Sequence, residues 1–160
     1  MVELMVAVSV IALGFLGLWT AFGQCLSLAR AHQETIAATE CLQQRVEQAR
    51  SVGWNALLSA NGISGQIFNT PCADAGMLPN LTETITVAPY PALTPAPTPL
   101  LVKRTADGTV TVVTQPAPAF DLRSILSVRV DFSMTWTDHQ NNRQHTRQNS
   151  TVIALEGLLR

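Results

Sequence analysis

An apolar segment at the start of the chain constrains the fold more than any other feature. Between Glu3 and Arg30 there is no charged side chain, and Leu4 to Leu28 (the apolar segment) consists almost entirely of apolar residues and glycine. A helix of about 20 residues crosses the hydrocarbon layer of a membrane at roughly 1.5 Å per residue. The apolar segment therefore predicts one membrane-spanning helix. It is longer than the apolar region of about 7 to 15 residues in a cleaved signal peptide, which favours a retained anchor.

The helical pattern continues beyond the apolar segment but becomes amphipathic. No glycine or proline interrupts residues 24–52, and one face is predicted from apolar or small residues at steps of three and four: Ile36, Thr39, Leu42, Val46 and Ala49. Polar residues such as Glu34 and Arg45 are expected on the other faces. We therefore expect one long helix that ends at Gly53, because glycine readily adopts the left-handed conformation found at many helix ends.

The rest of the chain has the patterns of short helices, strands and loops. A short helix is predicted over residues 54–60, followed by a turn at Asn61-Gly62. The proline-rich residues 89–99 predict an extended surface loop, and Asp107-Gly108 predicts a tight hairpin. Side chains alternate between apolar and polar most clearly over residues 128–136. The predicted strands are 82–88, 100–104, 109–114, 128–136 and 144–155.

These elements predict an α+β fold in which a long N-terminal helix packs on a small, mainly antiparallel β-sheet. The length of 160 residues is that of about one globular domain. We divide the chain into residues 1–29, the membrane half of the helix, and residues 30–160, a globular domain that includes the amphipathic half.

Charge and cysteine content narrow the function classes. The formal net charge of −1 provides no positive field to attract nucleic acid, so no nucleic-acid partner is predicted. Cys25 lies near the end of the apolar segment, whereas Cys41 and Cys72 lie in the polar part of the chain. A Cys41–Cys72 disulfide is plausible if that part is outside the cytoplasm, although sequence alone leaves the pairing open.

The sequence predicts neither an enzyme nor a cofactor site. Asp138, His139 and His145 have side chains that can bind zinc, but no further ligand follows at a characteristic spacing. A solvated polar hairpin is the favoured interpretation of these residues. No catalytic constellation and no phosphate-binding glycine loop occurs in the sequence.

The first residues resemble a known targeting and assembly motif. Val2 to Gly14, in which the single glutamate Glu3 leads a long apolar helix, resembles the prepilin-type N-terminal motif. Residues 13–18 and the polar helical stretch that follows look like the type IV pilus modification class of minor pilins. The strand ending at Trp136-Thr137-Asp138 and the return strand over residues 151–155 are also similar to that class, with less specificity.

The resemblance implies a structural role and a set of partners. Such proteins are minor pilins or minor pseudopilins of type IV pili or type II secretion systems, processed by a prepilin peptidase and methylated at the new N-terminal amine. They reside in the inner membrane with a periplasmic domain and then join other pilin or pseudopilin subunits through the N-terminal helix. A single-pass, membrane-anchored periplasmic binding module that does not polymerise is the alternative.

The glutamate has two interpretations. The resemblance implies that Glu3 pairs with the N-terminal amine of a neighbouring subunit during assembly, whereas a local interpretation places it favourably at the positive end of its own helix. The family has four residues ahead of the glutamate and a short basic leader before them, whereas only Met1 and Val2 precede Glu3 here. We expect that a truncated start explains this difference.

Overall fold

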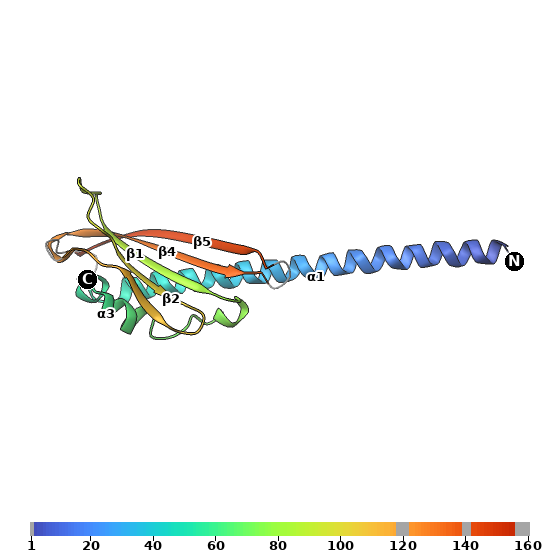
Figure 1. The fold of residues 1–160 in the computed structure, drawn as a ribbon, viewed down its shortest axis with the longest axis horizontal. Coiled ribbons are helices and arrows are strands. Elements are labelled where there is room, and N and C mark those ends of the chain that lie inside the picture. Colours follow the sequence, from blue (N-terminus) through green and yellow to red (C-terminus); the bar gives the residue numbers. More distant parts are fainter. Residues whose placement is uncertain (1, 118–121, 139–141, 156–160) are drawn as a thin grey trace. The chain divides into compact units, whose positions relative to one another are not determined.

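The protein has the α+β architecture predicted from its sequence (Figure 1). The computed structural model describes residues 2–117, 122–138 and 142–155. The chain divides into two compact units, Met1–Thr35 and Ile36–Arg160. In its described residues the first unit is entirely helical, and the second contains the end of the same helix, several short helical segments and a five-stranded antiparallel sheet.

Helix α1 spans Val2–Ser51 and continues through both units. Within the second unit it buries one face, formed by Ala37, Ala38, Cys41, Leu42, Val46 and Ala49. The prediction was correct for Leu42, Val46 and Ala49 but wrong for Ile36 and Thr39, which are exposed. The buried face is shifted by one position at its start, where the small side chains of Ala37 and Ala38 pack into the core.

The end of α1 differs from the prediction. The helix stops at Ser51, and Gly53 has φ −61° and ψ 147°, an extended conformation that precedes the next helix. Gly53 is therefore not a left-handed helix end. Helix α2 follows at Trp54–Leu57, and the buried Trp54 and Leu57 orient it toward the core.

The predicted turn at Asn61-Gly62 is wrong, because both residues are helical. Helix α3 covers Ala60–Gly62 and continues into the π-helical segment η1 at Ile63–Ile67. Ser59 caps α3, its hydroxyl accepting a hydrogen bond from the Gly62 amide at 3.1 Å. A Cβ atom at Gly62 would lie 2.2 Å from the Ala56 carbonyl oxygen. Glycine is required here for a close backbone approach and not for a turn.

The sheet confirms the predicted strands to within one or two residues. Its order is β3-β2-β1-β4-β5, with antiparallel pairing throughout. The strands are β1 Thr82–Pro89, β2 Leu100–Arg104, β3 Val110–Thr114, β4 Ser127–Thr137 and β5 Gln144–Ala154. Short 3-10 segments occur at Ala75–Met77 and Leu122–Ser124.

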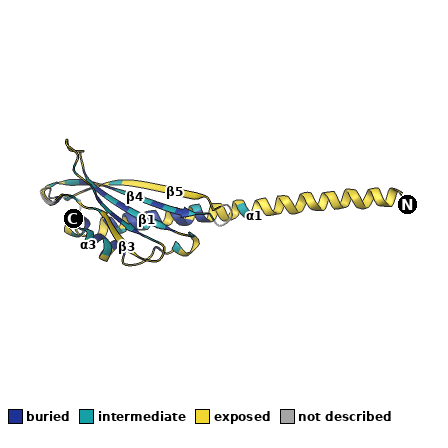
Figure 2. Ribbon diagram, in the orientation of Figure 1, coloured by how far each residue is buried: buried dark blue, intermediate teal, exposed yellow. Residues whose placement is uncertain are grey.

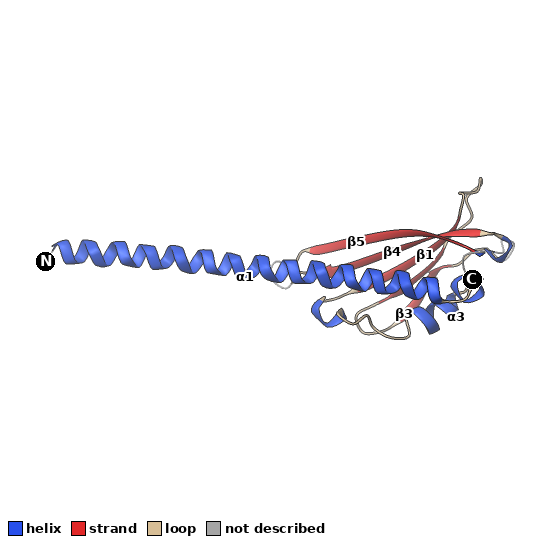
Figure 3. Cartoon of the chain, turned by 180° about the vertical axis from the view of Figure 1, so that it is seen from behind, coloured by secondary structure: helices blue, strands red, loops and turns tan. Residues whose placement is uncertain are grey.

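Two predicted connections are also confirmed. The β2–β3 hairpin turns at Asp107-Gly108, where Gly108 has φ 86°, a left-handed conformation that glycine adopts without strain. Residues 90–99 form the proline-rich loop between β1 and β2 and are mostly exposed. Figure 3 shows this loop as an irregular segment beyond the strands.

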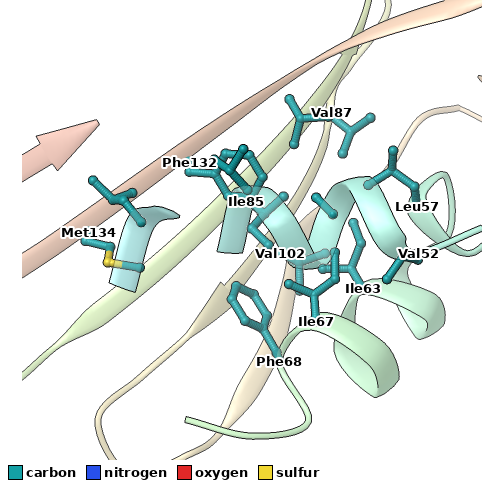
Figure 4. Close-up of a cluster of buried hydrophobic side chains, with 14 of the residues drawn as sticks. Val52, Leu57, Ile63, Ile67, Phe68, Ile85, Val87, Val102, Phe132 and Met134 are labelled. Atoms are coloured by element: carbon teal, nitrogen blue, oxygen red, sulfur yellow. The ribbon is translucent and has the colours of Figure 1, made fainter. Parts of the chain in front are cut away.

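The core of the second unit lies between the buried face of α1 and one face of the sheet (Figure 4). Burial alternates along β1 and β4, so that each strand contributes every second side chain. The core side chains of the sheet include Ile85, Val87, Val102, Phe132 and Met134. Leu57, Ile63 and Ile67 from the short helices pack into the same cluster.

Candidate functional site

The first half of α1 presents a largely apolar surface that carries no charged side chain after Glu3. Every residue from Val2 to Leu26 is exposed, including large side chains such as Trp19, which is 81% exposed (Figure 2). The helix is long and apolar enough to cross a membrane. Contiguous exposed apolar surface of this extent on a soluble protein marks a site of interaction with lipid or with another protein.

Glu3 lies in the first turn of α1, ahead of the apolar segment. At that position its carboxylate faces the positive end of the helix dipole, which is worth typically about 0.3–1 kcal/mol. The next charged residue along the chain is Arg30. At about 1.5 Å per residue it lies roughly 40 Å away along the helix, too far for an ion pair. A basic side chain that neutralises Glu3 therefore cannot come from this half of the helix.

Small residues in the apolar segment leave room for a neighbouring helix. Added Cβ atoms at Gly14, Gly17 and Gly23 would meet nothing within 4 Å. Surfaces with small side chains allow helix backbones to approach closely in lipid or in a helical assembly. These positions permit helix–helix contact but do not identify the partner.

Cys41 and Cys72 are joined by a disulfide with Cα atoms 5.4 Å apart. Cys41 belongs to the buried face of α1, and Cys72 lies in the segment between η1 and the 3-10 turn at Ala75–Met77. The bond therefore ties this segment to the helix. Cys25 has a free, exposed thiol.

A buried charge cluster of Arg45, Glu83 and Arg104 connects α1 to the sheet. Glu83 Oε2 lies 2.6 Å from Arg45 Nε, and Glu83 Oε1 lies 2.8 Å from Arg104 Nη1. Arg45 also donates hydrogen bonds to the carbonyl oxygens of Ile67 and Thr70, and its guanidinium lies 5.4 Å from the centre of the Phe68 ring. Arg45 was expected on a face other than the apolar one, yet its side chain is buried, being 1% exposed.

The strand pattern of β1 predicts that the Glu83 side chain is buried, although Glu83 is not apolar. Along β1, Glu83 has the same parity as the buried Ile85 and Val87, so the strand period directs its side chain into the core. A carboxylate at such a position requires a basic partner. Glu34, also expected on a face other than the apolar one, is 8% exposed.

The polar hairpin that contains Asp138, His139 and His145 lies only partly within the described residues. His139 is outside the described residues. His145 lies near the start of β5 and stacks on Trp136 of β4, with ring centres 5.6 Å apart. Among the described residues, no three His, Cys, Asp or Glu side chains are grouped closely enough to hold a metal ion.

The outer face of the sheet is polar. A hollow of about 560 Å³ opens over β1, β4 and β5, lined by Thr86, Arg129, Asp131, Phe132, Ser133, Gln148, Asn149 and Ser150. Asp131 is held in place by Arg129, with Nε at 3.0 Å, and by the Ser150 hydroxyl at 2.6 Å.

The described structure thus combines an exposed apolar helix carrying Glu3 with a disulfide-linked β domain. No protein-family model, curated protein or solved structure matches this chain.

Proposed function

We propose that this chain is a structural subunit, a minor pilin or minor pseudopilin, that takes part in assembly of a bacterial type IV pilus or type II secretion pseudopilus. The observation that carries the proposal is the combination of Glu3 with the exposed, largely apolar surface of α1 that follows it. The α+β arrangement of a long N-terminal helix on an antiparallel sheet is consistent with a pilin-like fold.

The apolar segment supplies both a location and an assembly surface. Before assembly it anchors the subunit in the inner membrane as a single span, where lipid covers its apolar side chains. In a filament, the helices of sister subunits cover the same side chains. The subunit then exchanges lipid contacts for helix–helix contacts, and Gly14 and Gly17 leave space for a close approach.

Glu3 determines how neighbouring helices are aligned. A charged residue at the centre of a membrane helix costs about 2.5–3.5 kcal/mol on insertion scales, and less near an end. The N-terminal amine of a neighbouring subunit, processed by a prepilin peptidase and methylated, compensates this cost by forming a charge pair with Glu3. The pair fixes the axial position of one helix against the next.

The second unit forms the periplasmic part of the subunit. The Cys41–Cys72 disulfide supports this location, because disulfides persist in oxidising compartments such as the bacterial periplasm. The polar outer face of the sheet and the exposed proline-rich loop are available on this unit for contacts outside the filament core.

The test compares two glutamate substitutions on the same helix. The protein is produced from its complete native gene, with Glu3→Ala or with Glu47→Ala as the matched control, in the bacterium that assembles its filament system. Glu47 is an exposed residue of the second unit, whose side chain is 71% exposed. The amount of the chain is measured in the inner membrane and in filaments sheared from the cells.

The proposal predicts that Glu3→Ala stays in the membrane but is lost from filaments, whereas the Glu47→Ala variant and the unchanged chain are present in both. Mass spectrometry of the unchanged chain should show a processed and methylated N-terminus. A membrane-bound, unmethylated chain that is absent from filaments would contradict the proposal and favour the non-polymerising binding module.

A further inference from the structure

Strand β5 is a long, regular edge of the sheet. It pairs with β4 over 11 residues without a register shift, and in the described part of the chain no strand pairs with its other side (Figures 1 and 3). The opposite edge strand, β3, has 5 residues and a register shift opposite Leu101 and Val102. Natural proteins protect edges with short strands, bulges, prolines or charges, because a free edge pairs readily with another chain.

The hydrogen bonds at both ends of β5 identify the backbone groups on its free side. The Asp138 amide donates to the Arg143 carbonyl at 2.8 Å, and the Leu155 amide donates to the Leu126 carbonyl at 2.9 Å. Hydrogen-bonded and non-hydrogen-bonded pairs alternate along an antiparallel ladder. With the observed register, the odd-numbered residues of β5 therefore bond to β4.

Six residues of β5 consequently direct their amide and carbonyl groups away from the sheet: Gln144, Thr146, Gln148, Ser150, Val152 and Ala154. All six are exposed. The hydrogen bonds on the other side of β4 are consistent with this assignment. The Tyr90 amide donates to the Ser127 carbonyl, so the odd-numbered residues of β4 bond toward β1 and the even-numbered ones bond toward β5. The free edge thus offers a continuous row of donors and acceptors at the spacing of a β-ladder.

The charges on β5 restrict what can pair with this edge. The strand contains no Asp or Glu, and Arg147 is exposed on it, with Arg143 four residues earlier on the same side. His145 lies between them in the same alternation. Opposite charges on adjacent strands stabilise pairing, and like charges directly opposite each other destabilise it. A parallel, in-register pairing of β5 with a second copy of itself would place Arg147 opposite Arg147 and is disfavoured, whereas a carboxylate opposite Arg147 is favoured.

We propose that β5 is a docking edge for an extended segment of a partner protein that carries carboxylates at alternate positions. The partner segment adds a sixth strand to the sheet: its backbone bonds to the six outward residues, and its carboxylates lie near Arg143 and Arg147. The edge belongs to the second unit, and this binding does not depend on assembly through the apolar segment.

The test uses a defined peptide and the full chain in detergent micelles. The probe is a synthetic peptide of alternating Glu and Thr residues, and its control has Lys in place of Glu. We expect the acidic peptide to bind about tenfold more tightly than the Lys peptide, because its carboxylates attract Arg143 and Arg147 whereas the Lys side chains repel them. This difference in affinity should shrink at high salt. Equal binding of the two peptides would overturn the proposal.

Hydrogen exchange tests the backbone assignment. In the free chain the amides of Thr146, Gln148 and Ser150 should exchange rapidly, and the acidic peptide should protect them. The amides of His145 and Arg147 should be protected with and without peptide, because they bond to β4. If the peptide leaves the outward amides unprotected, the docking edge is not its site.

Two variants separate backbone pairing from charge. Gln148→Pro removes one outward donor while leaving the β4 ladder intact, a position where an edge strand tolerates proline, and Gln148→Ala is the matched control that keeps the donor. Gln148→Pro should bind the acidic peptide at least about tenfold more weakly than Gln148→Ala. Arg147→Glu should abolish the preference between the two peptides even if the proline variant does not fold, because each peptide then makes one favourable and one unfavourable pair. Unchanged binding by a folded Gln148→Pro variant, or an unchanged preference in Arg147→Glu, would overturn the proposal.

Discussion

Arg45 of helix α1 and Glu83 of strand β1 form an ion pair in the core, with Arg45 Nε 2.6 Å from Glu83 Oε2 and side chains that are 1% and 2% exposed. Arg104 of β2 contacts the other carboxylate oxygen. Helix and sheet are therefore held in one register by directional contacts as well as by apolar packing. Removing one partner of such a buried ion pair strongly destabilises the fold, because the other charge remains buried without a counter-charge.

The first prediction concerns this charge cluster. Glu83→Gln should lower the free energy of unfolding by about 3–5 kcal/mol, since two guanidinium groups remain buried without a counter-charge. Urea unfolding of the full chain in detergent, followed by tryptophan fluorescence, measures the change. Glu47→Gln removes the exposed pair with Arg50 and should cost less than about 1 kcal/mol. Equal urea midpoints for the two variants would contradict the account.

The second prediction concerns the disulfide. Cys41 and Cys72 are 31 residues apart, and closing a loop of this length stabilises the folded state by about 3.5 kcal/mol in the chain-entropy account. The double substitution of Cys41 and Cys72 by serine should lower the free energy of unfolding by that order, measured with urea. Cys25→Ser should leave it unchanged, because this thiol is exposed and free. Thiol titration of the denatured, unreduced chain should find one free cysteine; finding three would contradict the pairing.

The third prediction concerns two glycines in neighbouring turns. Gly62→Ala should destabilise the fold by more than about 2 kcal/mol, because its Cβ would overlap the Ala56 backbone at 2.2 Å. Gly65→Ala, where an added Cβ meets nothing within 4 Å, should be neutral or stabilising by up to about 1 kcal/mol. Thermal unfolding of both variants checks the contrast. Equal melting temperatures would show that the close approach at Gly62 is not required.

The fourth prediction is a pH dependence in the β2–β3 hairpin. Hydrogen bonds from the Thr105 hydroxyl and from the amide and hydroxyl of Thr109 lower the pKa of the Asp107 carboxyl from 3.8 to about 2. Because the folded-state pKa is depressed, the carboxylate stabilises the hairpin above pH 3.8, and this contribution is lost as the pH falls toward 2. The stability difference between the unchanged chain and Asp107→Asn should therefore shrink over this range.

NMR titration of the Asp107 carboxyl measures that pKa directly. A midpoint close to 3.8 would contradict the proposed hydrogen-bond arrangement. Thr105→Val removes the largest contribution and should move the midpoint back toward the ordinary value.

Local patterns predicted most of the secondary structure because buried apolar side chains recur along the sequence with the period of the helix or strand that carries them. The alternation from Val128 to Trp136 identified β4 since one face of the strand is buried. Asp107-Gly108 identified the hairpin since Gly108 requires a positive φ. Gly62 was misinterpreted because its constraint comes from Ala56 in a neighbouring helix, which a dipeptide signal does not contain.

The features that depend on distant contacts were not predictable in the same way. Arg45 and Glu83 are 38 residues apart, so a local pattern gives the face of each side chain but not its partner. The free edge of β5 follows from the strand order of the sheet, which local sequence does not define. Glu3 was selected from the sequence alone, but its proposed partner belongs to another subunit, so its assembly role remains a prediction.

The state of the native protein in its own cells tests the central proposal most directly. The chain is recovered from the membrane pellet after alkaline carbonate extraction, and its intact mass is measured. We predict that the protein remains in the pellet until detergent is added and that its mass includes Leu4 to Leu28. A soluble protein that begins after Leu28 would contradict the proposal, because neither the membrane anchor nor the assembly surface would remain.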